Sequence, residues 1–144
     1  MRISQREFVI IIACLMSMVA LTTDAMLPAL GLMARDFAVD GNAIQLVITG
    51  VFAGHALGQL VYGPISDKYG RRSSIFLGLA IFSLGSVISA SATSLEAMLM
   101  GRFLQGFGAS GPRVMVVALV RDCYSGPAMA RIMSFAMTLF MAVP

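Results

Sequence analysis

The sequence predicts an all-α polytopic membrane protein, and three observations support this fold class. First, the 144 residues are 58% hydrophobic and 12% charged, about half the charged fraction usual in soluble domains. Second, the apolar residues form long runs at about 8–33, 43–62, 74–92 and 95–120. Runs of roughly 20 apolar residues are the length that crosses a bilayer as a helix. Third, the segments between the runs alternate in the sign of their charge.

The charge alternation predicts the orientation of the chain. Segments 1–7, 67–72 and 121–131 carry net charges of +1, +2 and +1, whereas 34–42 and 91–97 each carry −1. Because cytoplasmic segments are enriched in Lys and Arg, we expect a cytoplasmic N-terminus in an inner membrane. The basic residues lie at the ends of the runs and form no single solvated face, so nucleic acid is not an expected partner. Cys14 and Cys123 give neither metal spacing nor a disulfide framework, and no metal or cofactor is expected.

The first run contains an acid. Asp24 lies sixteen residues after Phe8, about 24 Å into a core of about 30 Å. A carboxylate at that depth is costly unless it is protonated, paired or facing water, so Asp24 is a functional candidate; a surface acid that reaches out to water is the alternative. Pro28 removes the hydrogen bond that would reach the Asp24 carbonyl and so opens the helix beside it. A signal peptide is disfavoured because further apolar runs follow.

The second run, 43–62, contains glycines four residues apart at Gly50, Gly54 and Gly58. Such a stripe predicts close packing against another helix. His55 is a minor candidate for a functional group on a neighbouring face. We expect Pro64 to end this helix and Gly70 to permit a sharp reversal in a short charged loop. The third run, 74–92, has no ionisable residue and is expected to be scaffold.

The fourth run contains two arginines, which are costly in a span and usually partnered. Arg102 lies about 10 Å from the outer edge, similar to the depth of Asp24, so an ion pair between them is one hypothesis; bonding of Arg102 to exposed backbone is the other. Arg113 lies near the inner edge. A glycine-rich stretch between the two arginines is expected to loosen the helix; its residues are Gly106, Gly108, Ser110, Gly111 and Pro112.

Two motifs resemble those of one family. Residues 63–72 match G-x-x-x-D-[RK]-x-G-R-[RK], which resembles the loop between helices two and three of the major facilitator superfamily of transporters. The residues that match are Gly63, Asp67, Lys68, Gly70, Arg71 and Arg72. Residues 102–111 resemble the fourth-helix motif R-x-x-Q-G-x-G-[AG] of the same superfamily. With Asp24, Pro28 and the V-R-D turn at 120–122, the chain resembles the N-terminal part of bicyclomycin/chloramphenicol-type drug:proton antiporters.

The resemblance implies a fold and a mechanism. The chain would supply four transmembrane helices and part of a fifth (132–144) of a twelve-helix fold, as a truncated N-terminal half whose partner is the missing C-terminal half. Alternating access within the lipid bilayer would exchange a drug-like small molecule for protons. Asp24 and Arg102 would couple protons, and Arg71 would pair with Asp122 at an inner gate formed with the loop residues. Cavity candidates are Gln105, Gly106, Arg113 and His55.

Other readings of the sequence remain open. The loop motif is shared across the superfamily, so a proton-coupled metabolite or nutrient carrier is the first alternative. A small membrane interaction module that assembles through the glycine stripe is the second. Some drug-exporting relatives have a second acid two turns before Asp24, where this chain has Met16. An enzyme is the least supported class, because no nucleophile–base pair or metal spacing occurs in the sequence.

Overall fold

The computed structural model describes residues 5–24, 26–39 and 41–142, and the regular elements in these ranges are all helical. They are α1 (Gln5–Asp24), the 3-10 helix η1 (Leu27–Ala29), α2 (Leu30–Asp36), α3 (Gly41–Tyr69), α4 (Arg71–Ala90), α5 (Leu95–Cys123) and α6 (Gly126–Ala142). The all-α fold class is confirmed. The predicted segments 1–7, 34–42 and 132–144 extend in part over residues outside these ranges.

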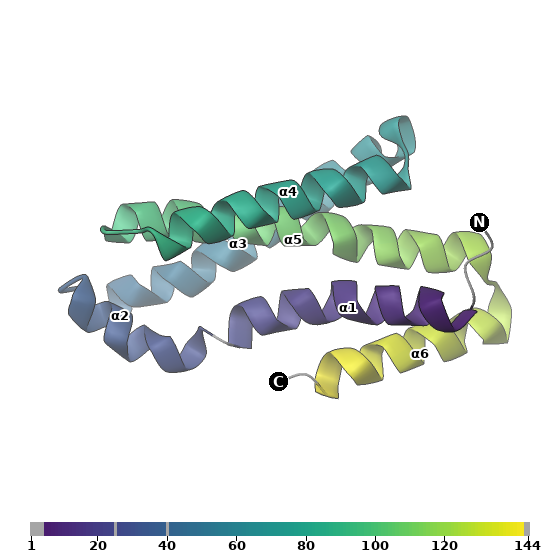
Figure 1. The fold of residues 1–144 in the computed structure, drawn as a ribbon, viewed down its shortest axis with the longest axis horizontal. Coiled ribbons are helices and arrows are strands. Elements are labelled where there is room, and N and C mark those ends of the chain that lie inside the picture. Colours follow the sequence, from purple (N-terminus) through teal and green to yellow (C-terminus); the bar gives the residue numbers. More distant parts are fainter. Residues whose placement is uncertain (1–4, 25, 40, 143–144) are drawn as a thin grey trace.

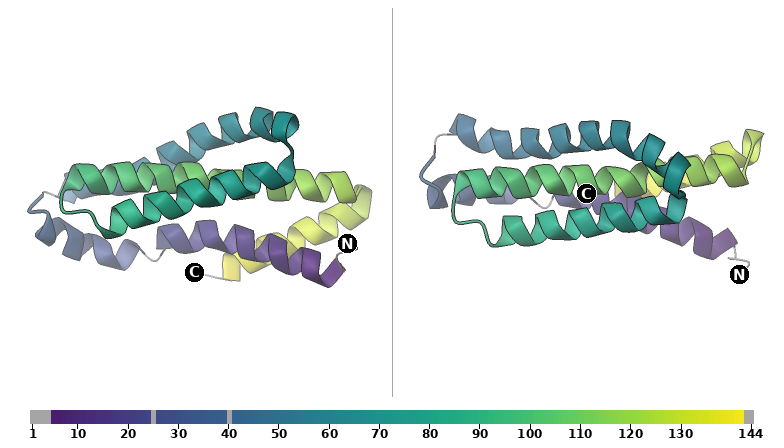
Figure 2. Two further views of the ribbon diagram at one scale, coloured as in Figure 1. Left: turned by 45° about the horizontal axis from the view of Figure 1, so that its top comes forward. Right: turned by 90° about the horizontal axis from the view of Figure 1, so that it is seen from above.

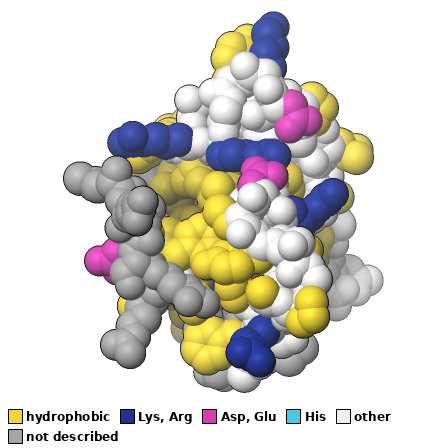
Figure 3. Space-filling model, turned by 90° about the vertical axis from the view of Figure 1, so that its right-hand side faces the viewer, with side chains coloured by type: hydrophobic (Ala, Val, Ile, Leu, Met, Phe, Trp, Pro, Cys, Tyr) yellow, Lys and Arg dark blue, Asp and Glu magenta, His cyan; other side chains and the backbone are white. Residues whose placement is uncertain are grey.

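The helices run back and forth along one axis (Figures 1 and 2). The start of α1, the α3–α4 turn and the α5–α6 turn lie at one end of the bundle, which we call the basic end. The α2–α3 and α4–α5 connections lie at the opposite end. Lys and Arg side chains are spread around an apolar centre at the basic end (Figure 3). The segments that the charge pattern places on one side of a membrane therefore meet at one end of the molecule.

The described residues contain four stretches that are long and apolar enough to cross a membrane. They are Glu7–Asp36, Asn42–Tyr69, Arg71–Ala90 and Leu95–Cys123. These stretches correspond to the four predicted apolar runs, although the third ends at Ala90, two residues before its predicted end. Elsewhere helix extends beyond the predicted ends in several places. For example, α6 begins at Gly126, so the predicted inner loop 121–131 is helical except at Tyr124 and Ser125.

The prediction that Pro64 ends the second span is wrong, because α3 continues through Pro64 to Tyr69. A proline inside a helix removes a single backbone donor, and the next turn re-forms around it. Ser66 Oγ donates to the Gly63 carbonyl at 3.0 Å, and the Gly70 N–H bonds to the Ser66 carbonyl at 2.9 Å. The predicted loop is therefore a helix end followed by Gly70, whose φ of +87° lies in the region that glycine adopts most readily.

Helix α5 is the centre of the bundle and packs between α3 and α4. The glycine-rich stretch was expected to loosen it, but α5 is unbroken through Pro112. A Cβ added at Gly106 would meet the backbone of Val51 in α3, and one at Gly108 would meet the backbone of Phe82 in α4. Gly101 and Gly85 likewise bring α4 and α5 into backbone contact. These glycines permit close helix packing, and neighbouring helices support the segment that they were expected to weaken.

The glycine stripe of α3 is also used inside the chain. A Cβ at Gly54 would meet the backbone of Phe103 and Phe107, and one at Gly58 would meet Ser110, all in α5. Close packing through the stripe is confirmed for these two positions; a Cβ added at Gly50 would lie in ordinary contact with the Leu99 carbonyl, at 3.6 Å. Gly54 and Gly58 are therefore covered by α5 of the same chain and are not open to packing against another chain.

The first span is broken where a continuous helix over 8–33 was expected. Helix α1 ends at Asp24, η1 contains Pro28, and α2 follows directly. The break has the physical reason predicted from the sequence, because Pro28 has no N–H to donate to the Asp24 carbonyl. Two apolar clusters flank the break. One joins α1 to α5 and α6 through Ile12, Met16, Val116, Val120 and Ile132, and the other joins Met26 to Ile44, Val47 and Met98.

Candidate functional site

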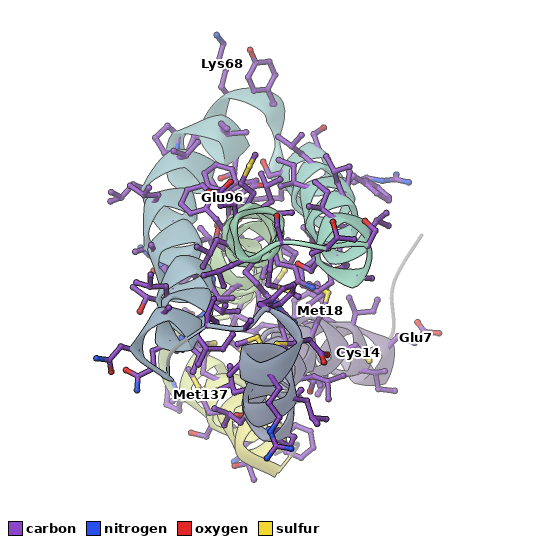
Figure 4. All side chains as sticks on the ribbon, turned by 90° about the vertical axis from the view of Figure 1, so that its left-hand side faces the viewer. Glu7, Cys14, Met18, Lys68, Glu96 and Met137 are labelled. Atoms are coloured by element: carbon purple, nitrogen blue, oxygen red, sulfur yellow. The ribbon has the colours of Figure 1, made fainter. Side chains whose placement is uncertain are left out.

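A cavity of about 370 Å³ lies beside the break in the first span. One wall comes from α1, η1 and α2, and the other from α4 and α5. Its lining residues are Met18, Leu21, Thr22, Met26, Ala29, Met33, Phe82, Arg102 and Gln105. Figure 4 shows Met18 directed from α1 into the bundle, whereas Glu7 points outward from the same helix. Methionine is flexible and polarizable, so three methionines give this wall an adaptable apolar surface.

The polar part of the cavity wall is a chain of hydrogen bonds between α5 and α4. Arg102 Nη1 donates to Gln105 Oε1 at 3.0 Å, and Gln105 Nε2 donates to Ser86 Oγ at 2.8 Å. Ser86 Oγ in turn donates to the Phe82 carbonyl at 2.9 Å. Gln105 is buried, and both ends of its amide are bonded. These contacts hold the Arg102 guanidinium at the edge of an otherwise apolar cavity. Ser86 was not predicted from the sequence, because one serine in an apolar run gives no signal by itself.

The predicted Asp24–Arg102 ion pair is absent from this structure. Asp24 is half-buried at the last residue of α1, outside the set of residues that lines the cavity. Arg102 bonds to the Gln105 side chain, so the alternative of bonding to exposed backbone is not observed either. Within the described part of the chain, the buried Arg102 Nε has no hydrogen-bond partner. The Nε–H of Arg102 is therefore a hydrogen-bond donor, beside the cavity, that could bond to a further acceptor.

The other predicted cavity residues lie elsewhere. Gly106 packs on Val51, and its carbonyl lies 3.4 Å from Nδ1 of the buried His55. Arg113 Nη1 lies 3.4 Å from His55 Nε2. Arg113 also lines a second hollow, of about 310 Å³, together with Gln59, Val114, Val117, Ala118 and Arg121. The structure thus brings Arg102 and Gln105 together, and places His55 and Arg113 at a separate site between α3 and α5.

Arg71 joins three helices at the basic end. Its Nε donates to Asp122 Oδ2 of α5 at 3.3 Å, which is the contact that the resemblance implies. Its Nη1 donates to Ser66 Oγ at 2.7 Å and lies 3.5 Å from Asp67 Oδ1, both in α3. Ser66 is 3% exposed and was not predicted; its position inside the motif is the signal that could have identified it. One guanidinium on α4 therefore holds the ends of α3 and α5.

The remaining motif residues are less constrained. Lys68 Nζ lies 5.2 Å from the Tyr69 ring centroid, and the Arg72 guanidinium lies 5.7 Å from that of Phe76. Both cations are exposed at the basic end, and Lys68 projects away from the bundle (Figure 4). A Cβ added at Gly63 would meet nothing within 4 Å. Gly63 is therefore not required for packing among these helices.

Comparison with known proteins gives the following similarities. The family model described as Major Facilitator Superfamily matches residues 12–144. A bicyclomycin resistance protein homolog of Haemophilus influenzae is 31% identical over 137 residues, which are 95% of this chain and 34% of the relative. Multidrug resistance protein D of Escherichia coli is 38% identical over 98 residues, 68% of this chain and 25% of the relative. A chloramphenicol resistance protein of Pseudomonas aeruginosa is 36% identical over 107 residues, 74% of this chain and 26% of the relative.

The matched region is a limited part of each relative. The chain spans between about a quarter and a third of the length of these three proteins. The similarity therefore concerns helices that occupy one part of a longer transporter.

Proposed function

Because the chain belongs to the Major Facilitator Superfamily, whose members are transporters, we propose that it forms the N-terminal part of a proton-coupled multidrug efflux antiporter. Its partners in this role are the lipid bilayer, protons, a drug-like small molecule and a second helical half. The three drug-resistance relatives support export over other transport. The alternative function, a proton-coupled metabolite or nutrient carrier, would take its substrate up, whereas the proposed antiporter exports it.

The observation that carries this proposal is the cavity beside the broken first span. Its wall is mostly apolar, includes three methionines, and has one fixed polar patch at Arg102 and Gln105. Ligand sites for small molecules are typically apolar clefts with a few well-placed polar groups. In transporters they lie near the bilayer midplane beside discontinuous helices. The break after Asp24 supplies such a discontinuity.

Proton coupling rests on Asp24 and Arg102. Asp24 is an acid at the end of a broken membrane helix, and intramembrane acids commonly serve as proton carriers. Arg102 has a donor without a hydrogen-bond partner in the described structure. We propose that a change in the tilt of α1 brings the Asp24 carboxylate to Arg102 in one state, and that protonation of Asp24 releases it. Alternating access would then link proton entry to drug exit.

The test is proton-driven efflux by the protein expressed from its native gene. In energised membrane vesicles, Asp24→Asn is expected to abolish chloramphenicol export driven by a pH gradient, because it removes the titratable proton and nearly keeps the shape. Asp24→Glu is expected to retain part of the activity with a shifted pH dependence. Asp36→Asn, which removes an exposed acid from the same span, is the control and should leave export unchanged. If Asp24→Asn exported chloramphenicol as well as the parent at every pH, the proton site would lie elsewhere. If the parent protein showed proton-driven uptake in place of export, the metabolite carrier would be favoured.

We also propose that the basic end faces the cytoplasm. The described charges gathered there include Lys68, Arg71, Arg72, Arg121 and Arg131, and cytoplasmic ends are enriched in such residues. In a variant without native cysteines, single cysteines at Asn42 and Lys68 should react with an impermeant thiol reagent from opposite sides of the membrane. Reaction of both from the same side would contradict the orientation and the span assignment.

A further inference from the structure

The hollow between α3 and α5 is separate from the cavity at Arg102, and its lining has a distinct chemistry. Its floor is one face of α5, formed by Val114, Val117 and Ala118. Arg113 and Arg121 stand at its two ends, eight residues and about 12 Å apart along the helix. Gln59 of α3 adds an amide, and the lining contains no Asp or Glu. Two cations and an amide around an apolar floor are complementary to an anion that carries an apolar body.

The buried His55 contacts Arg113 and helps to orient it. A carbonyl oxygen only accepts hydrogen bonds, so His55 Nδ1 is the donor in its contact with the Gly106 carbonyl. A guanidinium only donates, so His55 Nε2 is the acceptor from Arg113 Nη1. The two partners therefore select the neutral Nδ1–H form of the ring. His55 is 9% exposed and fixes one Nη of Arg113, which orients the rest of the guanidinium group.

We propose that this hollow binds a small amphipathic organic anion, such as a carboxylate or phosphate ester with a short apolar chain. Arg113 contacts the anionic group, and His55 acts as its positioning residue. The volume of about 310 Å³ lies at the lower end of the range for small-molecule pockets. Arginine suits this role because its planar donors match carboxylate and phosphate oxygens in pairs.

Binding of such an anion does not depend on proton coupling. The further statement that the anion is a transported molecule rests on the proposed function. The two are tested separately, because equilibrium binding needs neither a pH gradient nor Asp24.

The experiment measures binding calorimetrically with the protein from its native gene in phosphatidylcholine nanodiscs, with empty discs subtracted. Hexyl phosphate is expected to bind, and inorganic phosphate is expected to bind more weakly. Hexyltrimethylammonium, which has the same chain and the opposite charge, is expected not to bind.

The variants test which side chains hold the anion. Arg113→Gln should weaken hexyl phosphate binding about tenfold or more, since it removes a charge-assisted contact. His55→Leu should weaken it by a smaller factor, and Arg113→Lys should recover part of the loss. Arg121→Gln, at an exposed position, tests the second cation without disturbing buried contacts.

The matched control is Arg72→Gln, which removes the same charge at the same end of the bundle but beside Phe76 of α4. It should leave the dissociation constant within about twofold, because Arg72 is not among the residues that line the hollow. If Arg72→Gln and Arg113→Gln weakened hexyl phosphate binding equally, the effect would be due to net charge alone, and the proposal would be overturned. No binding of hexyl phosphate, or equal binding of inorganic phosphate, would overturn it as well. A rise in unfolding temperature with phosphatidylglycerol but none with hexyl phosphate would assign the hollow to a lipid instead.

Discussion

Buried polar side chains in the spans differ in whether they have partners, and this decides their effect on stability. Gln105 bonds at both ends of its amide, to Arg102 and Ser86. Tyr62 is fully buried against the Phe107 ring, with centroids 5.5 Å apart. Its hydroxyl has no hydrogen-bond partner among the residues that the structure describes. Leaving a buried polar group without a partner is costly, whereas removing such a group is not.

We therefore expect Tyr62→Phe to leave the unfolding temperature unchanged or raise it. Gln105→Leu should instead lower the stability by about 1–3 kcal/mol, because it leaves the donor of Arg102 and the hydroxyl of Ser86 with fewer partners. Both variants are compared with the parent by thermal unfolding in one detergent. A loss in Tyr62→Phe as large as that in Gln105→Leu would show that the tyrosine hydroxyl is bonded after all.

The sequence identified Arg102 and Gln105 but not their contact, and it predicted an Asp24–Arg102 pair that this structure lacks. The reason is geometric. Counting residues estimates the depth of a side chain in the bilayer, but not the direction in which it points around its helix. That direction depends on the break at Pro28 and on how α1 packs against α5, neither of which local spacing determines. The Arg71–Asp122 contact was predictable because a whole motif, and not depth alone, implied it.

At the scale of whole helices, the predictions for glycine and proline rested on their local propensities, and the helices are continuous at both kinds of residue. Gly106 and Gly108 would weaken an isolated helix, yet in α5 they sit against the backbones of Val51 and Phe82. Pro64 removes one hydrogen bond from α3, and the turn after it is held by Ser66. Packing between helices thus explains the glycines, and hydrogen bonds at the end of α3 explain Pro64. A single sequence shows neither directly. Hydrophobic runs and their spacing did predict the four membrane-spanning stretches.

Two glycines of α3 make a matched test of this conclusion. A Cβ at Gly54 would collide with the Phe103 and Phe107 backbones, the Phe107 amide nitrogen at 2.9 Å, so Gly54→Ala must push α3 away from α5. We expect a loss of about 1–3 kcal/mol, the usual cost of overpacking. A Cβ at Gly63 would meet nothing within 4 Å outside its chain neighbours. Gly63→Ala should therefore change the stability by less than about 1 kcal/mol, because helix propensity favours Ala whereas the following Pro64 disfavours a Cβ before it. Unfolding temperatures measure both changes, and equal shifts in the same direction would contradict the packing assignment.

The whole molecule is arranged around α5, which carries a functional candidate near each end. Arg102 and Gln105 lie on its face toward the broken first span, and Asp122 lies in its last turn at the basic end. Arg71 joins that last turn to α3. Charge alternation along the chain was sufficient to predict which connections share an end, because each span reverses direction. Which helices touch was not predictable in the same way, since every span offers apolar or small residues on several faces.

We propose that Arg71 acts as a gate by fixing the relative positions of three helices, since it contacts Asp67 of α3 and Asp122 of α5. If the ion pair with Asp122 stabilises one transport state, Arg71→Asp and Asp122→Arg should each reduce efflux by the protein expressed from its native gene. The double exchange should recover part of it. Recovery will be incomplete because an acid at position 71 would face Asp67 and lose the bond to Ser66. Both partners are partly exposed, at 33% and 54%, so the coupling energy from the double-mutant cycle should be about 0.2–1 kcal/mol.

The neighbouring arginine gives the control for this exchange. Arg72 lies one residue further along α4 and packs on Phe76 without contacting Asp122, so Arg72→Asp combined with Asp122→Arg should recover nothing. Efflux is normalised to the amount of protein in the membrane, because a charge reversal at the basic end can also impair insertion. Raising the salt concentration should weaken the Arg71–Asp122 coupling, since exposed charges are screened. Equal recovery by the two exchanges would mean that only net charge at the basic end matters, and the gate assigned to Arg71 would be rejected.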